Sequence, residues 1–398
     1  MPIRVLQVSK EKELRRIFVK LKVDAYGIRI MSPKTENFLL QLDELSAPAA
    51  NILKQEALSC GGDFVLPREA IFGKRKKTSG ILIVNLSQFN RLKEKLYFQP
   101  FGLKKISHDI SDALKNYSRD NFGLKLCRHK LRIGRRALIM GIMNLTPDSF
   151  SGDGLEGAGI NSILEYALKL SEDGADIIDL GGESSRPGAK KVSLNEELRR
   201  VIPAVKIIAK NIKKIPISID TCKPEVARQA LDNGACIVND ISGLRNLAMA
   251  KICAKYKAGV VIMHMQGIPG SMQKKPSYCS VMGEIIAYLD KAMLTALNAG
   301  MEKEKIIIDP GIGFGKTLEH NLEILKNLRE LKVLGAPILV GTSRKAFIGK
   351  ILKAAPSERI MGTVASCVIA CAKGANIVRV HDVRNVAQAL KLSSAILN

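Results

Sequence analysis

The sequence predicts an α/β protein in which a (β/α)₈ TIM barrel follows a small α+β domain. The first observation behind this prediction is a series of short apolar runs, each ending in polar or Gly residues and followed by a stretch with apolar residues three and four positions apart. Buried strands that alternate with amphipathic helices are typical of a parallel sheet covered by helices. The second observation is that eight such units fill residues 137–398, which fits a closed barrel of about 250 residues. A doubly wound open sheet is the alternative, but it rarely contains eight consecutive strands that are equally buried.

The order of elements in this region repeats one strand and one helix. The predicted strands lie at residues 137–144, 175–182, 216–221, 236–242, 259–264, 305–311, 337–343 and 376–382. Between them, helical patterns such as SILEYALKLSEDG and EVARQALDNG end at a Gly, which is a common signal for the end of a helix.

Residues 1–128 form the predicted N-terminal domain, of unknown role, and residues 129–398 form the barrel domain. The patterns in the first part are mixed, so we assign it to the α+β class. Its predicted elements are strands at 20–31 and 80–88 and helices at 37–45, 49–62 and 88–96. This part also carries most of the excess charge: residues 1–136 hold 28 basic and 13 acidic residues in a chain whose net charge is +24.

Composition narrows the class of protein further. The sequence has no run of about 18 apolar residues, and it starts with MPIRVLQVSKEKELRR, which puts charges where a signal peptide needs an apolar segment. We therefore expect neither a membrane protein nor a secreted one. Eight scattered Cys with no C-x-x-C pair indicate reduced thiols and a cytoplasmic location.

Two basic segments, residues 73–80 and 128–136, are candidates for contacting nucleic acid, because clustered Lys and Arg neutralise phosphates. The N-terminal domain has few aromatic residues and no stacking motif of the RNA-binding type. A solvated basic surface is the favoured interpretation, and no nucleic-acid partner is expected.

Polar residues follow nearly every predicted barrel strand. The chemistry of such a barrel lies at the C-terminal ends of the strands, where side chains from different strands converge. The strand ends carry Asn144, Asp179, Asp220, Asn239, His264, Asp309, Ser343, Arg344, Lys345, Arg379 and His381. Arg186, in the loop after the second strand, adds a planar guanidinium suited to phosphate oxygens. These groups fit a ligand with an anionic tail and a flat polar head, and the head could be a pterin or a purine. For Asp179 and His264, a structural role inside the barrel is the alternative to ligand binding.

Seven segments carry a resemblance to a known family. They are, in order, GIMNLTPDSFSGDG, DLGGESSRPGA, SIDTCKPEVA, VNDISG, DPGIGFGKT, GTSRKAFIG and RVHDV. Over residues 137–397 the chain resembles the dihydropteroate synthases, pterin-binding barrel enzymes of folate biosynthesis. The resemblance implies a transferase that condenses 6-hydroxymethyl-7,8-dihydropterin diphosphate with 4-aminobenzoate to give 7,8-dihydropteroate and pyrophosphate.

The resemblance also implies roles for individual residues. Those that would hold the pterin are Asp220, Asn239, Asp309 and Lys345, with Met263 and Phe314 packed near it. Those that would bind the diphosphate are Arg186, Arg379 and His381, with Asn144 as a ligand of Mg²⁺. Those that would surround 4-aminobenzoate are Phe150, Ser185, Pro187, Phe314 and Lys345. Ala346 departs from the family pattern, which often has Ser after the SRK motif, so a hydroxyl contact to the benzoate is lost there.

The implied reaction has a good leaving group, so we expect an S_N1-like substitution in which Asp220 and Asp309 stabilise a pterin methylene cation and Lys345 completes the catalytic set. A folate-dependent methyltransferase is the nearest alternative, and an inactive barrel that serves as a scaffold for a nucleic-acid-binding N-terminal domain is another. GGESSRPGA and SRK favour the synthase, since a methyl carrier has no diphosphate. The segment 359–375 is apolar on nearly every face and needs a partner surface; the family implies a homodimer, and cover by the N-terminal domain is the alternative.

Overall fold

The computed structural model describes residues 3–397 apart from 7, 9, 10, 74, 75, 128, 135, 146–159 and 185–190. The chain divides into two compact units, Met1–Asp112 and Ala113–Asn398. The second unit therefore begins before residue 129, where the sequence predicts the barrel domain to start. None of the helices within the described ranges is long and apolar enough to cross a membrane.

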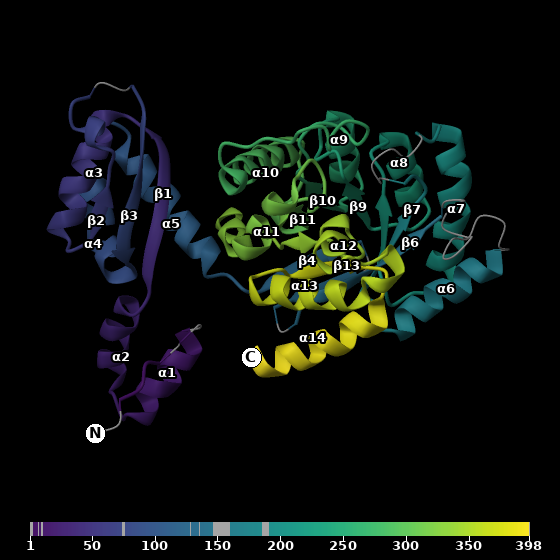
Figure 1. The fold of residues 1–398 in the computed structure, drawn as a ribbon, viewed down its shortest axis with the longest axis horizontal. Helices are drawn as coiled ribbons and strands as arrows, with labels where there is room; N and C mark the ends of the chain where they lie inside the picture. Colours follow the sequence, from purple (N-terminus) through teal and green to yellow (C-terminus); the bar gives the residue numbers. More distant parts are fainter. Residues whose placement is uncertain are drawn as a thin grey trace. The chain divides into compact units, whose positions relative to one another are not determined.

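The second unit is a parallel barrel with helices around it (Figure 1). Its strands are β6 (Leu138–Asn144), β7 (Ile177–Gly181), β8 (Ile217–Asp220), β9 (Ile237–Asp240), β10 (Gly259–Met263), β11 (Ile306–Asp309), β12 (Leu339–Val340) and β13 (Ile377–Val380). Within the described part of the chain they form one eight-stranded sheet in the order β11-β10-β9-β8-β7-β6-β13-β12, and a parallel bridge between Ile308 and Ile338 joins its two edges. The predicted TIM barrel and its eight strands are confirmed.

Helices follow the strands and cover the outside of the barrel. They are α6 (Ile160–Glu172), α7 (Leu194–Asn211), α8 (Pro224–Asp232), α9 (Leu247–Lys255), α10 (Val281–Asn298), α11 (Leu318–Lys326), α12 (Ala346–Leu352), α13 (Ile360–Ala372) and α14 (Val383–Leu397). Their starts follow local chemistry: Ser193 accepts a hydrogen bond from Glu196 N–H at the start of α7, and Pro224 takes the first position of α8, where an N–H is not needed. On α13, Met361 and Ile369 remain exposed.

A two-stranded antiparallel hairpin, β4 (Phe122–Leu126) and β5 (His129–Ile133), packs against the starts of the barrel strands. Leu124 and Leu126 are fully buried there, in one cluster with residues from both the first and the last strands of the barrel. A Cβ on Gly259 would lie 2.6 Å from a methyl carbon of Leu126, so β10 accepts the hairpin only because residue 259 has no side chain. The hairpin thus closes the amino end of the barrel, which explains why the second unit begins before residue 129.

The first unit holds a three-stranded antiparallel sheet, counted over the described residues, in the order β1-β3-β2. Its elements are α1 (Glu11–Lys20), α2 (Ala25–Met31), β1 (Asn37–Leu45), α3 (Ala47–Ser59), β2 (Asp63–Val65), β3 (Thr78–Asn85), α4 (Leu86–Leu96) and the start of α5 (Leu103–Tyr117). The predicted α+β class is confirmed, but two elements are wrong. Residues 25–31 are helical where we expected a strand, since Asp24 caps the turn by accepting from Gly27 N–H, and residues 37–45 form a strand where we expected a helix.

Candidate active site

A row of polar residues crosses the carboxyl edge of the barrel sheet. Asn144 at the end of β6 is in register with Gly181 on β7, Gly181 with Asp220 on β8, and Asp220 with Asn239 on β9. Residues in register on parallel strands point their side chains to the same face of the sheet. A Cβ on Gly181 would lie 3.6 Å from Asn144 Oδ1 and 3.7 Å from Asp220 Cβ. The glycine therefore leaves a gap between an amide and a carboxylate.

Arg379 joins two acids at the carboxyl end of the barrel, which we call the barrel mouth. Its Nε donates to Asp179 Oδ2 and its Nη2 donates to Asp220 Oδ2, each at 2.6 Å. Asp179 is fully buried and also accepts from Asn239 Nδ2 at 3.1 Å, while its other oxygen, Oδ1, has no partner in the described part of the protein. Burial raises the pKa of Asp220 to about 7, because the cost of desolvating the carboxylate exceeds the attraction of Arg379. Further hydrogen-bond donors from a bound ligand would lower the pKa of Asp220 and so favour its ionised form.

Asp309, Lys345 and Phe314 form the opposite side of the mouth. Asp309 ends β11 and accepts from Gly311 N–H at 2.6 Å, and burial raises its pKa. Lys345 Nζ donates to the carbonyl of Ile312 at 2.7 Å and lies 4.1 Å from the centre of the Phe314 ring. Burial lowers the pKa of Lys345 to about 8. Phe314 packs against Met263, Met265 and Met272, so this side combines an acid and a cation with an apolar surface.

Lys316 is a second buried lysine, and it contacts the backbone of Phe314. Its Nζ is 3.0 Å from His264 Nδ1 and donates to the carbonyl of Phe314 at 3.0 Å. Only 3% of Lys316 and 4% of His264 is exposed, and burial lowers the pKa of Lys316 to about 7 and that of His264 to about 3. Both groups fix the Gly-rich turn that carries Phe314.

The last two strands bring further polar groups to the mouth. Ser343 Oγ after β12 lies 3.0 Å from His381 Nδ1 after β13. Arg344 forms an ion pair with Asp382, at 2.7 Å between Nη2 and Oδ1. Of the two cations in the SRK motif, Lys345 is thus the one that contacts the Phe314 turn.

The structure brings together most of the residues that the sequence singled out. Asn239 and Arg379 both donate to Asp179, and Arg379 also donates to Asp220. Lys345 contacts the turn of Phe314. The predicted site residues Phe150, Ser185, Arg186 and Pro187 lie outside the described residues. The sequence analysis did not identify Lys316 as a site residue, and for Asp179 it also offered a structural interpretation inside the barrel. The sequence signal for Lys316 was a lysine within the turn-rich segment DPGIGFGKT.

Comparison with known proteins agrees with this geometry. The family model described as "pterin binding enzyme" matches residues 140–381, which is more than half of the chain. The chain belongs to this family. Its match starts within β6 and ends just after β13, and it includes Asn144, Asp220, Asp309, Lys345 and Arg379.

Several members of the pterin-binding family are similar to this chain. A dihydropteroate synthase of Synechocystis is 48% identical over 265 residues, which are 66% of this chain and 91% of that protein. A dihydropteroate synthase of Escherichia coli K12 is 45% identical over 260 residues, 65% of this chain and 92% of that protein. A probable bifunctional folylpolyglutamate synthase/dihydropteroate synthase of Halobacterium salinarum is 38% identical over 353 residues, 87% of this chain and 41% of that protein. This last match extends well beyond the pterin-binding segment.

Solved structures give the same result. The dihydropteroate synthase of Yersinia pestis, in a complex with a sulfonamide drug, has a TM-score of 0.66 at 39% identity and covers 69% of this chain and 99% of its own. That of Xanthomonas albilineans, with 4-aminobenzoic acid, has a TM-score of 0.64 at 39% identity and covers 69% of this chain and 98% of its own.

Proposed function

We propose that this chain acts as a dihydropteroate synthase in folate biosynthesis. It is a transferase that condenses 6-hydroxymethyl-7,8-dihydropterin diphosphate with 4-aminobenzoate to give 7,8-dihydropteroate and pyrophosphate. The observation that carries this proposal is that Arg379 bridges the buried acids Asp179 and Asp220 at the same end of the barrel as Asp309 and Lys345. Acids on a flat apolar surface suit the N–H groups of a pterin, and the cations suit its diphosphate.

The residues divide into three groups by role. Asp220, Asn239 and Asp309 accept from and donate to the edge of the pterin, and the faces of Phe314 and Met263 pack against its ring. Arg379 and His381 bind the diphosphate together with Arg186. Lys345 contacts both substrates. The 4-aminobenzoate lies beside it, among Phe150, Ser185, Pro187 and Phe314. Binding of the pterin requires Arg379 to share or release its two carboxylates, which makes the guanidinium available to the phosphates.

The reaction proceeds by S_N1-like substitution. The bond between the pterin methylene carbon and the diphosphate oxygen breaks first, and its electron pair leaves with pyrophosphate. The ionised Asp220 and Asp309 stabilise the resulting cation by charge. The neutral amine of 4-aminobenzoate then forms the C–N bond and loses one proton to solvent, so the enzyme mainly has to orient it.

Mg²⁺ is the proposed cofactor, and the residues fit it as a single-ligand site. Among the described residues, no group of three or more His, Cys, Asp or Glu side chains is arranged to hold a metal. Asn144 offers one amide oxygen beside the gap over Gly181, and Mg²⁺ is commonly bound through one or two protein oxygens plus substrate phosphates and water. When bound, it would neutralise charge that develops on the leaving pyrophosphate.

Two further features belong to the proposal. The exposed Met361 and Ile369 on α13 support a homodimer, since an apolar helix face of this kind is stabilised by a partner. The scattered cysteines support a reducing, cytoplasmic location.

The test is a pyrophosphate-release assay with the pterin diphosphate, run with and without 4-aminobenzoate and Mg²⁺. We expect turnover that requires both substrates and Mg²⁺, and a single turnover of pyrophosphate release without 4-aminobenzoate. No pyrophosphate under any condition would refute the function. Release that depends strictly on 4-aminobenzoate in a single turnover would refute the S_N1-like order alone.

A further inference from the structure

Arg344, the residue before Lys345, has a left-handed backbone conformation. Its φ is +55°, in a region that residues with a Cβ rarely adopt because this carbon crowds the neighbouring backbone. Such a conformation persists only where the surrounding structure holds it, and it is concentrated at functional sites. Here it stands between Ser343, which contacts His381, and Lys345, which contacts the Phe314 turn.

The side chain of Arg344 is fixed by Asp382, which follows β13. Nη2 donates to Oδ1 at 2.7 Å and Nε donates to Oδ2 at 3.1 Å. A two-pronged contact of this kind fixes the orientation of the guanidinium plane as well as its distance. Asp382 comes directly after His381 in the chain. The ion pair therefore ties the SRK turn, residues 343–345, to the strand end that carries Arg379 and His381.

The backbone of Arg344 is held from a second direction, by α13 and the residue that precedes this helix. Its N–H donates to Thr363 Oγ1 at 3.0 Å, and its carbonyl accepts from Arg359 Nη1 at 3.0 Å. Thr363 is fully buried, so the N–H would lose its acceptor at a desolvation cost. Arg359 is anchored in turn, because its Nε donates to the carbonyl of Ala354 at 3.0 Å. The side chain, the N–H and the carbonyl of Arg344 thus each bind a different residue.

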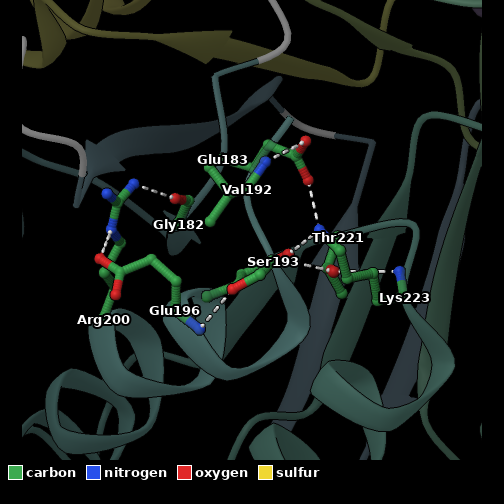
Figure 2. Close-up of polar contacts among 9 residues, drawn as sticks. Gly182, Glu183, Val192, Ser193, Glu196, Arg200, Thr221 and Lys223 are labelled. Carbon is green, nitrogen blue, oxygen red and sulfur yellow. Dashed lines mark hydrogen bonds and ion pairs between the residues drawn. The ribbon is translucent and has the colours of Figure 1, made fainter. Parts of the chain in front are cut away.

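The turn after β7 shows a less demanding way to hold a strand end. There Arg200 on α7 donates to the carbonyl of Gly182 at 3.0 Å and also pairs with Glu196 (Figure 2). Gly182 lies outside the left-handed region. The contacts of Arg200 therefore support an unstrained backbone, whereas those of Arg344 keep its backbone in a costly conformation.

The position of Lys345 depends on the residue before it. The N–H of Lys345 donates to the carbonyl of Thr342 at 3.2 Å, which closes the turn around Arg344. The lysine side chain then packs closely: a Cβ on Gly313 would lie 3.0 Å from Lys345 Cδ, and Nζ donates to the carbonyl of Ile312 at 2.7 Å. Relaxation of Arg344 to a negative φ would redirect the chain at Lys345 and break these contacts.

We propose that Arg344 is a positioning residue for Lys345: Asp382 and Thr363 hold it in the left-handed conformation, and this conformation aims the Lys345 ammonium group at the pterin diphosphate. The inference rests on the proposed function, because it takes Lys345 as a residue that contacts this substrate. Arg344 itself touches neither substrate. The affinity for the pterin diphosphate therefore depends on the backbone of residue 344 more than on its positive charge.

The first experiment uses the sign of φ. Ala at position 344 has to adopt the strained conformation without the ion pair, whereas Gly adopts it without a steric cost. Arg344→Ala, Arg344→Gly and Arg344→Lys are compared in the full chain. Arg136→Ala and Arg136→Gly are the matched controls, because Arg136 forms a similar two-pronged pair with Asp176 at the amino end of the barrel and has no positive φ. Calorimetry without Mg²⁺, which prevents turnover, measures the dissociation constant of the pterin diphosphate, and thermal unfolding measures stability.

We expect Arg344→Ala to raise this dissociation constant by about tenfold and Arg344→Gly by about threefold or less, because Gly keeps the left-handed backbone. At position 136, Gly should give no advantage over Ala. Binding by Arg344→Gly that is equal to or weaker than binding by Arg344→Ala would overturn the inference. So would full affinity in Arg344→Lys together with equal losses in the other two variants, since the charge alone would then matter.

The second experiment tests whether the effect passes through Lys345. Thr363→Val removes the acceptor of the Arg344 N–H at nearly constant volume, and Thr363→Ser keeps the hydroxyl. Ser366→Ala is the control on the same helix, because the Ser366 hydroxyl donates within α13 to the carbonyl of Thr363. We expect Thr363→Val to weaken binding of the pterin diphosphate by about three- to tenfold, and Thr363→Ser and the control to bind as the original chain does.

In the background of Lys345→Met, Thr363→Val should weaken binding by less than about twofold further, because the group through which it acts is already gone. A full additional loss in that background would overturn the inference. If Thr363→Val unfolds, the comparison of Arg344→Gly with Arg344→Ala decides, since the Arg344 side chain is partly exposed. Failure of the original chain to bind the pterin diphosphate or to release pyrophosphate would instead overturn the proposed function.

Discussion

Lys316 Nζ lies 3.0 Å from His264 Nδ1, and both residues are buried. Burial, together with the charge of Lys316, lowers the pKa of His264 to about 3, so the imidazole is neutral in the working range. Its Nδ1 therefore accepts from Lys316 and its proton sits on Nε2. A neutral His264 at this position orients Lys316, and Lys316 in turn holds the carbonyl of Phe314.

This contact predicts a loss of pterin binding in Lys316→Met. Without the ammonium group, the Phe314 carbonyl and His264 Nδ1 lose their donor, and the ring that packs on the pterin loses its fixed position. We expect kcat/KM for the pterin diphosphate to fall by about 10- to 100-fold, measured by steady-state kinetics at fixed 4-aminobenzoate. Lys305→Met is the control, because Lys305 is also buried but pairs with Glu302 at the opposite end of β11. Equal losses of kcat/KM in Lys316→Met and Lys305→Met would show that the loss follows from replacing any buried lysine and not from the contact between Lys316 and His264.

Asp220→Asn separates activity from stability. The variant should lose most turnover, since an amide cannot supply the charge proposed to stabilise the pterin cation. In the original chain the pKa of Asp220 is raised to about 7, so the folded state holds a proton that the unfolded state gives up near pH 4. Its contribution to stability is complete below pH 4 and is lost as the pH rises to 7.

The melting temperature of Asp220→Asn, relative to the original chain, should therefore increase between pH 4 and pH 7. Thermal unfolding at four or five pH values in this window measures the difference. A constant difference across the window would contradict the raised pKa, and an active Asp220→Asn enzyme would contradict the assigned role.

Two adjacent glycines at the end of β7 predict opposite outcomes. A Cβ on Gly181 meets Asn144 and Asp220 only at ordinary contact distance, whereas a Cβ on Gly182 would lie 2.7 Å from a methyl carbon of Val201. Gly181→Ala should keep the melting temperature and lower the affinity for the pterin diphosphate, because it fills the gap beside Asn144. Gly182→Ala should lower stability by about 1–3 kcal/mol through overpacking. For both variants, calorimetry measures the binding of the pterin diphosphate and urea unfolding measures stability. If Gly181→Ala lowered stability and Gly182→Ala lowered affinity instead, the proposed gap beside Asn144 would be refuted.

The hairpin predicts where the chain tolerates truncation. Removal of residues 1–112 leaves β4 and β5 in place and should retain dihydropteroate synthesis. Removal of residues 1–128 deletes Leu124 and Leu126, which are fully buried, and exposes the starts of the barrel strands. We expect that shorter protein to aggregate or to melt at a much lower temperature. Measurements of solubility, melting temperature and turnover on the two truncated proteins check this, and equal behaviour of the two would contradict a role of the hairpin in the barrel.

The barrel could be predicted because its strands are buried on both faces and so appear as continuous apolar runs. The N-terminal sheet was harder. In β1, NFLLQLDEL, apolar residues occur at both helical and alternating spacings, and pairing with β3 decides in favour of a strand. The hairpin was missed as part of the barrel because the charges in its second strand suggested an exposed basic segment, although Leu131 and Ile133 alternate with Lys130 and Arg132.

The acids of the site could be predicted from their place at strand ends, but their partners could not. Asp179 and Arg379 are 200 residues apart in the chain, and only closure of the barrel brings them within 2.6 Å. Lys316 was missed because a lysine in a Gly-rich turn is usually solvated, whereas here three carbonyl or imidazole acceptors surround it.

The hairpin also has a consequence for synthesis of the chain. Leu124 and Leu126 leave the ribosome before any barrel strand, yet the cluster in which they pack includes Leu339 and Ile377 near the end of the sequence. A nascent chain therefore exposes this apolar hairpin through most of translation, and association with other nascent chains competes with folding during that time. A chaperone that shields the hairpin until the final strand emerges would raise the yield of native enzyme without affecting its catalysis.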